Sequence, residues 1–123
     1  MRNVKYDLQE RLINFSVMVL EIVDQLPKTV MGIHFAKQLV KSGTSPAFHH
    51  GEAQSAESRK DFIHKLKIGA KELRETQVNI SILKKRRILA DLILDEILKE
   101  NNELIAIFVK SIQTATHNLR KET

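Results

Sequence analysis

The sequence predicts an all-α protein, an antiparallel up-down four-helix bundle, and three observations support this fold class. Apolar residues recur at steps of three and four in four long segments, which is the spacing of a helix face. Four glycines and two prolines leave little material for the many tight turns of an all-β protein. A chain of 123 residues with 42% apolar and 28% charged residues can bury the core of one domain. The expected single domain covers residues 1–123, with helices at about 4–26, 29–54, 59–86 and 90–119.

The first expected helix, residues 4–26, has two apolar rows and ends before Pro27, which restricts the residue that precedes it. The main row, spaced as one helix face, is Leu8, Leu12, Phe15, Val19, Ile22 and Leu26. A second row beside it is Ile13, Val17 and Leu20. A helix that is apolar on more than one side usually buries both sides, so the second row indicates a subunit contact. A wide core face is the alternative.

The second expected helix, residues 29–54, has Thr29 as its N-cap and is interrupted by the string from Ser42 to Pro46. Its expected inward face is Ile33, Ala36, Leu39 and Val40. Taken alone, the string resembles a helix stop followed by a restart. A stop at Ser42 would leave a helix of about 14 residues, whereas an up-down bundle needs helices of similar length. We therefore expect one helix with a kink at Pro46, which cannot donate to the carbonyl of Ser42.

The third expected helix, residues 59–86, has Ser58 as its N-cap and Asp61 at its third position. Its expected core row is Phe62, Leu66, Ala70, Leu73, Ile80 and Leu83. Another face, which we name the basic stripe, carries Lys60, His64, Lys67, Lys71 and Arg74 at steps of four and three. The helix ends near a basic cluster, Lys84, Lys85, Arg86 and Arg87. Cations in a last turn also complement the helix dipole, which explains part of that cluster structurally.

The excess positive charge of the chain is confined to one segment. Residues 59–87 hold ten basic and three acidic side chains, a net charge of +7, against zero for residues 1–58 and −2 for residues 88–123. Such a segment favours an anionic partner, and cations along a helix can follow a phosphate backbone without reading its sequence. The nine residues of the stripe and the cluster are therefore candidate contacts to RNA or DNA. The alternative is a solvated face whose charge is balanced by neighbouring helices, and no aromatic residues alternate with the cations to stack bases.

The fourth expected helix, residues 90–119, is also apolar on more than one side. Its expected core face is Leu92, Ile93, Ile97, Leu104, Phe108, Ile112, Ala115 and Leu119. A second row is Leu94, Leu98, Ile105 and Val109. Surplus apolar rows on the first and fourth helices predict self-association.

Ser45, His49 and Glu52 lie on one face of the second helix, at steps of four and three. A di-iron bundle needs two Glu-x-x-His motifs and further glutamates, which the sequence lacks. Nucleophilic catalysis needs a pocket and an oxyanion hole, which a helix surface does not offer. We therefore predict no enzyme activity, no metal site and no cofactor. We expect this polar face, with His50, to serve structure or assembly by bonding exposed backbone near Pro46.

The sequence also bears on the cellular compartment. It has no cysteine, which fits a reducing compartment, and its first ten residues lack the apolar core of a secretory signal. The longest apolar run, Val17–Leu20, is too short to cross a bilayer. We expect a cytoplasmic protein without a membrane partner.

Four strings between Ser42 and Thr76 resemble a known family. They are Ser42-Gly43-Thr44-Ser45, Glu52-Ala53-Gln54, Ser58-Arg59-Lys60-Asp61-Phe62-Ile63 and Lys71-Glu72-Leu73-Arg74-Glu75-Thr76. They resemble the four-helix-bundle family of the protein encoded in intervening sequences of bacterial 23S ribosomal RNA genes, also called S23 ribosomal protein. That family is similar to the accessory variability proteins of diversity-generating retroelements. The chain departs from many members at Pro46-Ala47-Phe48-His49, where they have Ile-Gly-Ala-Asn.

The resemblance implies a four-helix bundle that assembles into a ring, a homopentamer, with a positively charged surface suited to nucleic acid. The first functional hypothesis, motivated by the +7 segment and the basic stripe, is a non-enzymatic, homo-oligomeric accessory protein that binds RNA or DNA. The alternative is a scaffold that recognises another protein through its apolar and polar helix faces.

Overall fold

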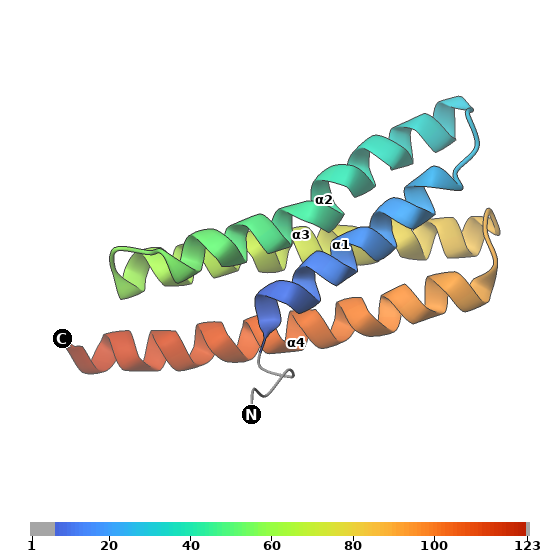
Figure 1. Ribbon diagram of the computed structural model, residues 1–123. Coiled ribbons are helices and arrows are strands. Elements are labelled where there is room, and N and C mark those ends of the chain that lie inside the picture. Colours follow the sequence, from blue (N-terminus) through green and yellow to red (C-terminus); the bar gives the residue numbers. More distant parts are fainter. Residues whose placement is uncertain (1–6, 123) are drawn as a thin grey trace.

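The computed structural model describes residues 7–122 and confirms the all-α class. It has four helices, α1 (Leu8–Asp24), α2 (Val30–Gln54), α3 (Arg59–Arg86) and α4 (Asp91–Glu122), and no strand within those residues. The three connections lie at alternate ends of the bundle, so that successive helices run in opposite directions (Figure 1). The expected start of the first helix at residue 4 lies outside the described residues. At its other end α1 stops at Asp24, two residues earlier than expected, and α4 extends past residue 119.

Side-chain caps begin three of the helices. The Thr29 hydroxyl accepts a hydrogen bond from the backbone N–H of Gly32 at 3.1 Å, and the Ser58 hydroxyl accepts one from Asp61 at 3.0 Å. Both caps are those that the sequence predicts. Asp7 caps α1 in the same way, by accepting from Glu10. Each cap satisfies a backbone donor that the first helical turn leaves free.

Helix α2 continues without a break through Pro46, in agreement with the length expected for a bundle helix. Two hydroxyls bond the backbone just before the proline: Thr44 Oγ1 donates to the Val40 carbonyl and Ser45 Oγ donates to the Lys41 carbonyl, each at 2.5 Å. The side chains of His49 and His50 bond other side chains and not the backbone near Pro46, so the sequence-based expectation for them is wrong. A local kink at Pro46 stays a prediction.

The inward face of α2 differs from the expected one. Ile33 and Val40 are 48% and 42% exposed, whereas Leu39 is fully buried. The buried positions of α2 are mainly small or polar: Gly32, Leu39, Ser42, Gly43, Pro46, Ala47, His50 and Ala53. Close approach of the neighbouring helices is the physical reason, since small side chains let two helix backbones lie near each other.

Gly43 marks a close contact between α1 and α2. A Cβ atom at Gly43 would lie 2.5 Å from Cγ1 of Val19, far inside contact distance. The Ser16 hydroxyl of α1 also lies 3.1 Å from the Gly43 carbonyl oxygen. Helices α1 and α2 therefore pack almost backbone to backbone at this point.

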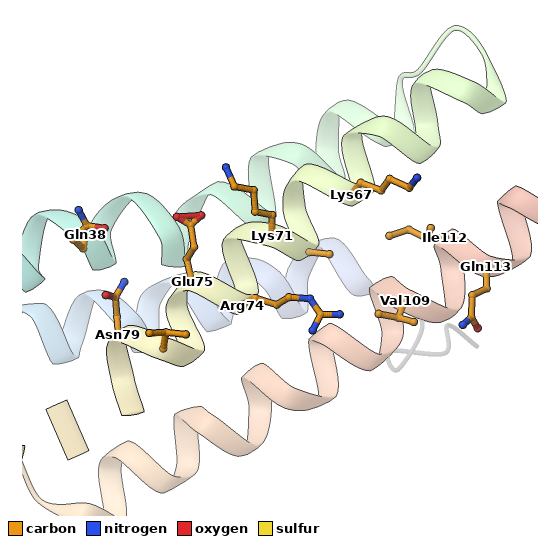
Figure 2. Close-up of a pocket in the computed structure, with 11 residues that line it drawn as sticks. Gln38, Lys67, Lys71, Arg74, Glu75, Asn79, Val109, Ile112 and Gln113 are labelled. Carbon is orange, nitrogen blue, oxygen red and sulfur yellow. The ribbon is translucent and has the colours of Figure 1, made fainter. Parts of the chain in front are cut away.

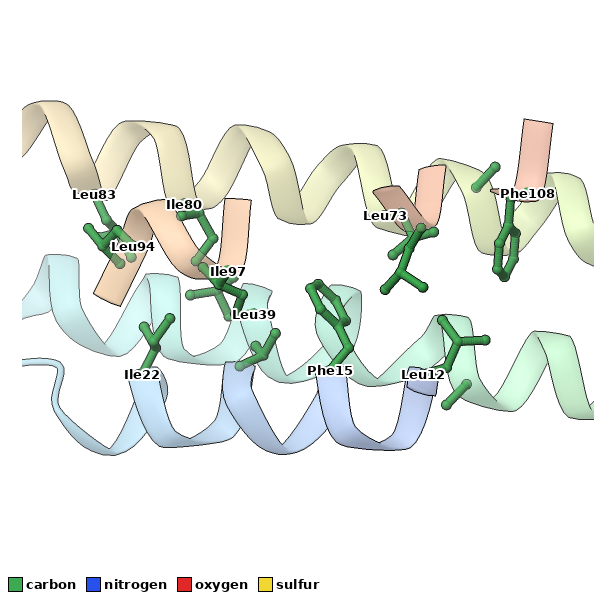
Figure 3. Close-up of a cluster of buried hydrophobic side chains, with 14 of the residues drawn as sticks. Leu12, Phe15, Ile22, Leu39, Leu73, Ile80, Leu83, Leu94, Ile97 and Phe108 are labelled. Carbon is green, nitrogen blue, oxygen red and sulfur yellow. The ribbon is translucent and has the colours of Figure 1, made fainter. Parts of the chain in front are cut away.

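The core runs along the bundle axis, and Figure 3 shows its side chains from Leu83 and Leu94 at one end to Phe108 at the other. The main row expected for α1 is confirmed: Leu12, Phe15, Val19 and Ile22 are at most 1% exposed. On α4 three expectations are wrong. Leu92 and Ile93 of the expected core face are 78% and 37% exposed, whereas Leu94 of the second row is fully buried. Leu98 and Ile105 of that row pack against the core.

The surplus apolar surface therefore lies on α1, as expected, but on α2 in place of the second row of α4. The second row of α1 is exposed, with Ile13 at 42%, Val17 at 48% and Leu20 at 38%. Ile33 and Val40 add exposed apolar surface on α2. Three members of the α4 row, Leu94, Leu98 and Ile105, join the core, whereas Val109 does not.

Buried polar contacts connect the helices across the core. Oγ1 of Thr76 on α3 lies 2.9 Å from Oγ of Ser42 on α2, and Asn101 on α4 donates to the Leu73 carbonyl at 3.0 Å. These three polar side chains are no more than 2% exposed. Apolar periodicity cannot identify such positions, and each contact satisfies a group that would otherwise destabilise the interior.

Candidate nucleic-acid interface

The five side chains of the basic stripe are all exposed on α3. No ion pair or hydrogen bond reaches any of them from residues 7–122. The stripe occupies one helix face because its steps of four and three match the helical repeat. Its charge is thus not balanced by the neighbouring helices.

Several other cations of the bundle form ion pairs, whereas no residue of the stripe does. Arg11 on α1 bonds Glu100 on α4 at 2.7 Å, and these charge-assisted bonds raise the pKa of Arg11. Three further pairs join Arg59 to Glu122, Lys65 to Glu52 and Lys41 to Glu72. The carboxylates of α2 and α4 therefore form ion pairs with cations beside the stripe but with no cation of the stripe itself.

The basic cluster at the end of α3 is built differently. Lys84 forms an ion pair with Asp95 of α4, and the hydrogen bond between them raises the pKa of Lys84. Arg87 is the C-cap of α3, in the left-handed conformation with φ 58°. Between stripe and cluster the same face carries Val78 and Ile82, 58% and 46% exposed. The two basic regions are separate surfaces.

Three stripe residues, Lys67, Lys71 and Arg74, border a groove of about 620 Å³. Its apolar lining is Ala70 and Val78 of α3 with Val109 and Ile112 of α4, and we name this set the groove floor. Amide side chains of Gln38, Asn79 and Gln113 and the carboxylate of Glu75 complete the lining. Figure 2 shows these side chains on α3, on the facing part of α4 and, for Gln38, on α2. Sequence reasoning placed Val109 and Ile112 in apolar rows without relating them to the cations.

The polar face of α2 does not form a catalytic relay. The Ser45 hydroxyl donates to the Lys41 carbonyl, so it is not directed at His49. His49 Nδ1 lies 3.3 Å from Glu52 Oε1, and the same carboxylate oxygen lies 3.5 Å from Lys65 Nζ. Within residues 7–122, no group of three His, Asp or Glu side chains could hold a metal ion.

His50 is a buried, hydrogen-bonded residue of the α1–α2 contact. Gln9 donates its amide N–H to the Ala47 carbonyl, which leaves its Oε1 to accept from His50 Nδ1 at 2.6 Å. His50 Nε2 then accepts from Gln54 Nε2 at 3.2 Å. Burial lowers the pKa of His50, partly offset by Asp7. This network needs a neutral imidazole, because an imidazolium has no lone pair for Gln54.

None of the helices in the described part of the chain combines the length and apolarity needed to cross a membrane.

Comparison with known proteins gives two matches. The family model described as 23S rRNA-intervening sequence protein matches residues 5–110. Among solved structures, the chain is similar to the crystal structure of a protein with unknown function from the S23 ribosomal protein family of Bacteroides thetaiotaomicron. The TM-score is 0.77 at 28% sequence identity, and the match covers 85% of this chain and 96% of that chain. No curated protein matches.

Proposed function

This chain belongs to the 23S rRNA-intervening sequence protein family, and we propose that it is a non-enzymatic, homo-oligomeric accessory protein of the cytoplasm that binds nucleic acid through α3. The unpaired basic stripe carries this proposal. Paired cations would have to give up a carboxylate before meeting a phosphate, whereas the stripe needs no such exchange. The sequence resemblance, which extends through the family to the accessory variability proteins of diversity-generating retroelements, is in keeping with this function.

The length and charge of the stripe determine how strongly the expected affinity for nucleic acid depends on salt. From Lys60 to Arg74 it extends about 21 Å along the helix, at about 1.5 Å per residue. Four of its members carry a permanent charge, so four phosphate contacts would give a slope of about −3.6 for log affinity against log salt on duplex DNA. Affinity would then fall about 150-fold between roughly 50 and 200 mM salt, with little dependence on sequence.

Fluorescence anisotropy with short RNA and DNA tests this function. The triple variant K67E/K71E/R74E is expected to abolish measurable binding at low salt. The matched control K37E/K99E/K110E makes the same change in net charge at exposed positions outside the stripe, and it is expected to bind far better than the stripe variant. Absence of binding by the native chain at low salt, or equal loss in both variants, would contradict the proposal.

We propose that self-association uses the exposed apolar rows of α1 and α2. The bond between Ser16 and Gly43 sets the register of these antiparallel helices, and it places the Leu20 turn of α1 opposite the Val40 turn of α2. Ile13 and Val17 on α1 and Ile33 on α2 are further exposed apolar residues of these two helices. A pentameric ring is the assembly that the family resemblance implies. Light scattering is expected to show an oligomer for the native chain and a monomer for the V17E/L20E variant. A native chain that is monomeric at micromolar concentration would refute self-association.

A protein-interaction scaffold is the second candidate function, and exposed Phe48 favours it. This aromatic side chain is 71% exposed beside His49 of the polar face. Exposed aromatic residues often anchor protein interfaces. The test is a pull-down. A protein partner that is recovered in stoichiometric amount after nuclease treatment, and is no longer recovered with Phe48→Ala, would support this function over the first.

A further inference from the structure

The groove beside the stripe combines two properties that a phosphate-binding surface alone does not need. Its rim carries Lys67, Lys71 and Arg74, and its floor is apolar. Cations bind phosphates without help from aliphatic side chains, so the floor adds nothing to a purely electrostatic contact. An occupant that uses the whole groove must be anionic at one edge and apolar at its centre.

We propose that the groove seats an unpaired base of single-stranded nucleic acid while the rim cations hold the adjoining phosphates. This inference rests on the proposed function and names the form of nucleic acid that the site takes. The volume of about 620 Å³ lies within the range of about 300–1,000 Å³ for sites that take one small ligand. One nucleotide unit therefore fits the groove, whereas a duplex exposes only its backbone and groove edges.

Arg74 supplies the planar surface that the sequence otherwise lacks. Unstacked bases bind on aromatic rings or on the plane of an arginine guanidinium. Arg74 is exposed and borders the groove opposite Val109, so a base can lie between the guanidinium and the aliphatic floor. The missing aromatic residues, which count against a long stacking platform, do not count against a site for a single base.

Glu75 provides a second, independent indication of a base. Its carboxylate borders the groove on the side of α2, near Gln38 (Figure 2), no hydrogen bond or ion pair from residues 7–122 reaches it, and Oε2 is a buried atom without a partner. A phosphate would be repelled by this group. The amino groups of cytosine, adenine and guanine are N–H donors that a carboxylate accepts. A ligand that carries both phosphates and N–H donors suits both the rim and Glu75.

The test compares a mixed-sequence strand about 12 nucleotides long with its duplex, by anisotropy over a range of salt. Electrostatics alone favours the duplex, whose higher charge density gives the steeper salt dependence. The single strand is nevertheless expected to bind about tenfold more tightly, and this preference should grow as salt is raised.

Two variants connect the preference to the groove. Val109→Asn removes apolar floor and is expected to weaken single-strand binding about tenfold while duplex binding stays unchanged. Val30→Asn, at a position that is 91% exposed at the start of α2, is the matched control and should change neither. Arg74→Lys keeps the charge but removes the plane, and it should lower the single-strand preference without a change in salt slope. This variant keeps the test valid if Val109→Asn does not fold.

The outcomes separate this inference from the function on which it rests. Equal affinity for strand and duplex, with binding still lost in K67E/K71E/R74E, would refute the base site and leave nucleic-acid binding in place. Insensitivity of both ligands to the triple variant would refute both.

Discussion

Gly43→Ala is expected to destabilise the bundle, although alanine is the better helix former. The new Cβ would lie 2.5 Å from Val19 Cγ1 and 2.8 Å from Val19 Cβ, whereas carbon atoms normally stay at least about 3.5 Å apart. Val19 is fully buried and cannot swing away. The helices must therefore separate by about 1 Å, which also weakens the bond between Ser16 and the Gly43 carbonyl.

The expected magnitude follows from two opposing terms. Overpacking a well-filled contact costs about 1–3 kcal/mol, and replacing a helical glycine by alanine returns about 1 kcal/mol. The net loss lies between about 0 and 2 kcal/mol, and its middle value of about 1 kcal/mol lowers the melting temperature by about 4 °C for a domain of this size.

Gly51→Ala is the matched control on the same helix. A Cβ at Gly51 would meet no atom closer than 3.6 Å, the Oε1 atom of Gln9. This substitution should therefore raise stability by about 0.5–1 kcal/mol. Combining Gly43→Ala with Val19→Ala should cost less than the sum of the two single changes, because the smaller residue leaves room for the new Cβ.

The assay is urea unfolding followed by circular dichroism, with protein concentration held constant so that self-association does not distort the comparison. Opposite signs for Gly43→Ala and Gly51→Ala are expected. Equal stabilisation by both substitutions would refute the close approach of α1 and α2.

Three further predictions concern His50, Arg87 and Thr76. Because burial lowers the pKa of His50, the unfolded chain binds its proton more readily, so stability should fall as pH drops below about 6.5; urea midpoints should show a flatter profile in His50→Gln, and an unchanged profile would contradict the role of burial. Arg87→Gly should stabilise the fold by about 0.5–1 kcal/mol in thermal melts, since glycine adopts the left-handed C-cap conformation without strain; destabilisation would contradict it. Thr76→Val leaves the Ser42 hydroxyl buried without its partner and should cost about 1–3 kcal/mol, partly recovered by adding Ser42→Ala; a cost of zero would show that the contact contributes nothing.

Features that depend on local chemistry could be read from the chain. Thr29 and Ser58 are helix caps because the capping hydrogen bond spans only three residues. The continuity of α2 through Pro46 followed from matching helix lengths, a property of the whole bundle. The main apolar row of α1 was identified because its period is that of a helix.

The face of α2 could not be predicted in the same way. Periodicity assigns large apolar residues to the interior, which favoured Ile33 and Val40. The structure buries Ser42 and Gly43 instead, because the distance between helices decides how large a buried side chain can be. That distance depends on how the neighbouring helices pack, so the spacing of apolar residues within one segment cannot predict it.

The basic stripe shows the same division. Its positions on one face of α3 follow from residue spacing alone. Whether its charge is balanced depends on which carboxylates the neighbouring helices bring within ion-pair distance. The fold places Glu52, Asp95 and Glu122 beside Lys65, Lys84 and Arg59, and leaves the stripe unpaired. An ion pair acts over a few ångströms between segments distant in the chain, so only the packing of helices could distinguish a balanced surface from a binding surface.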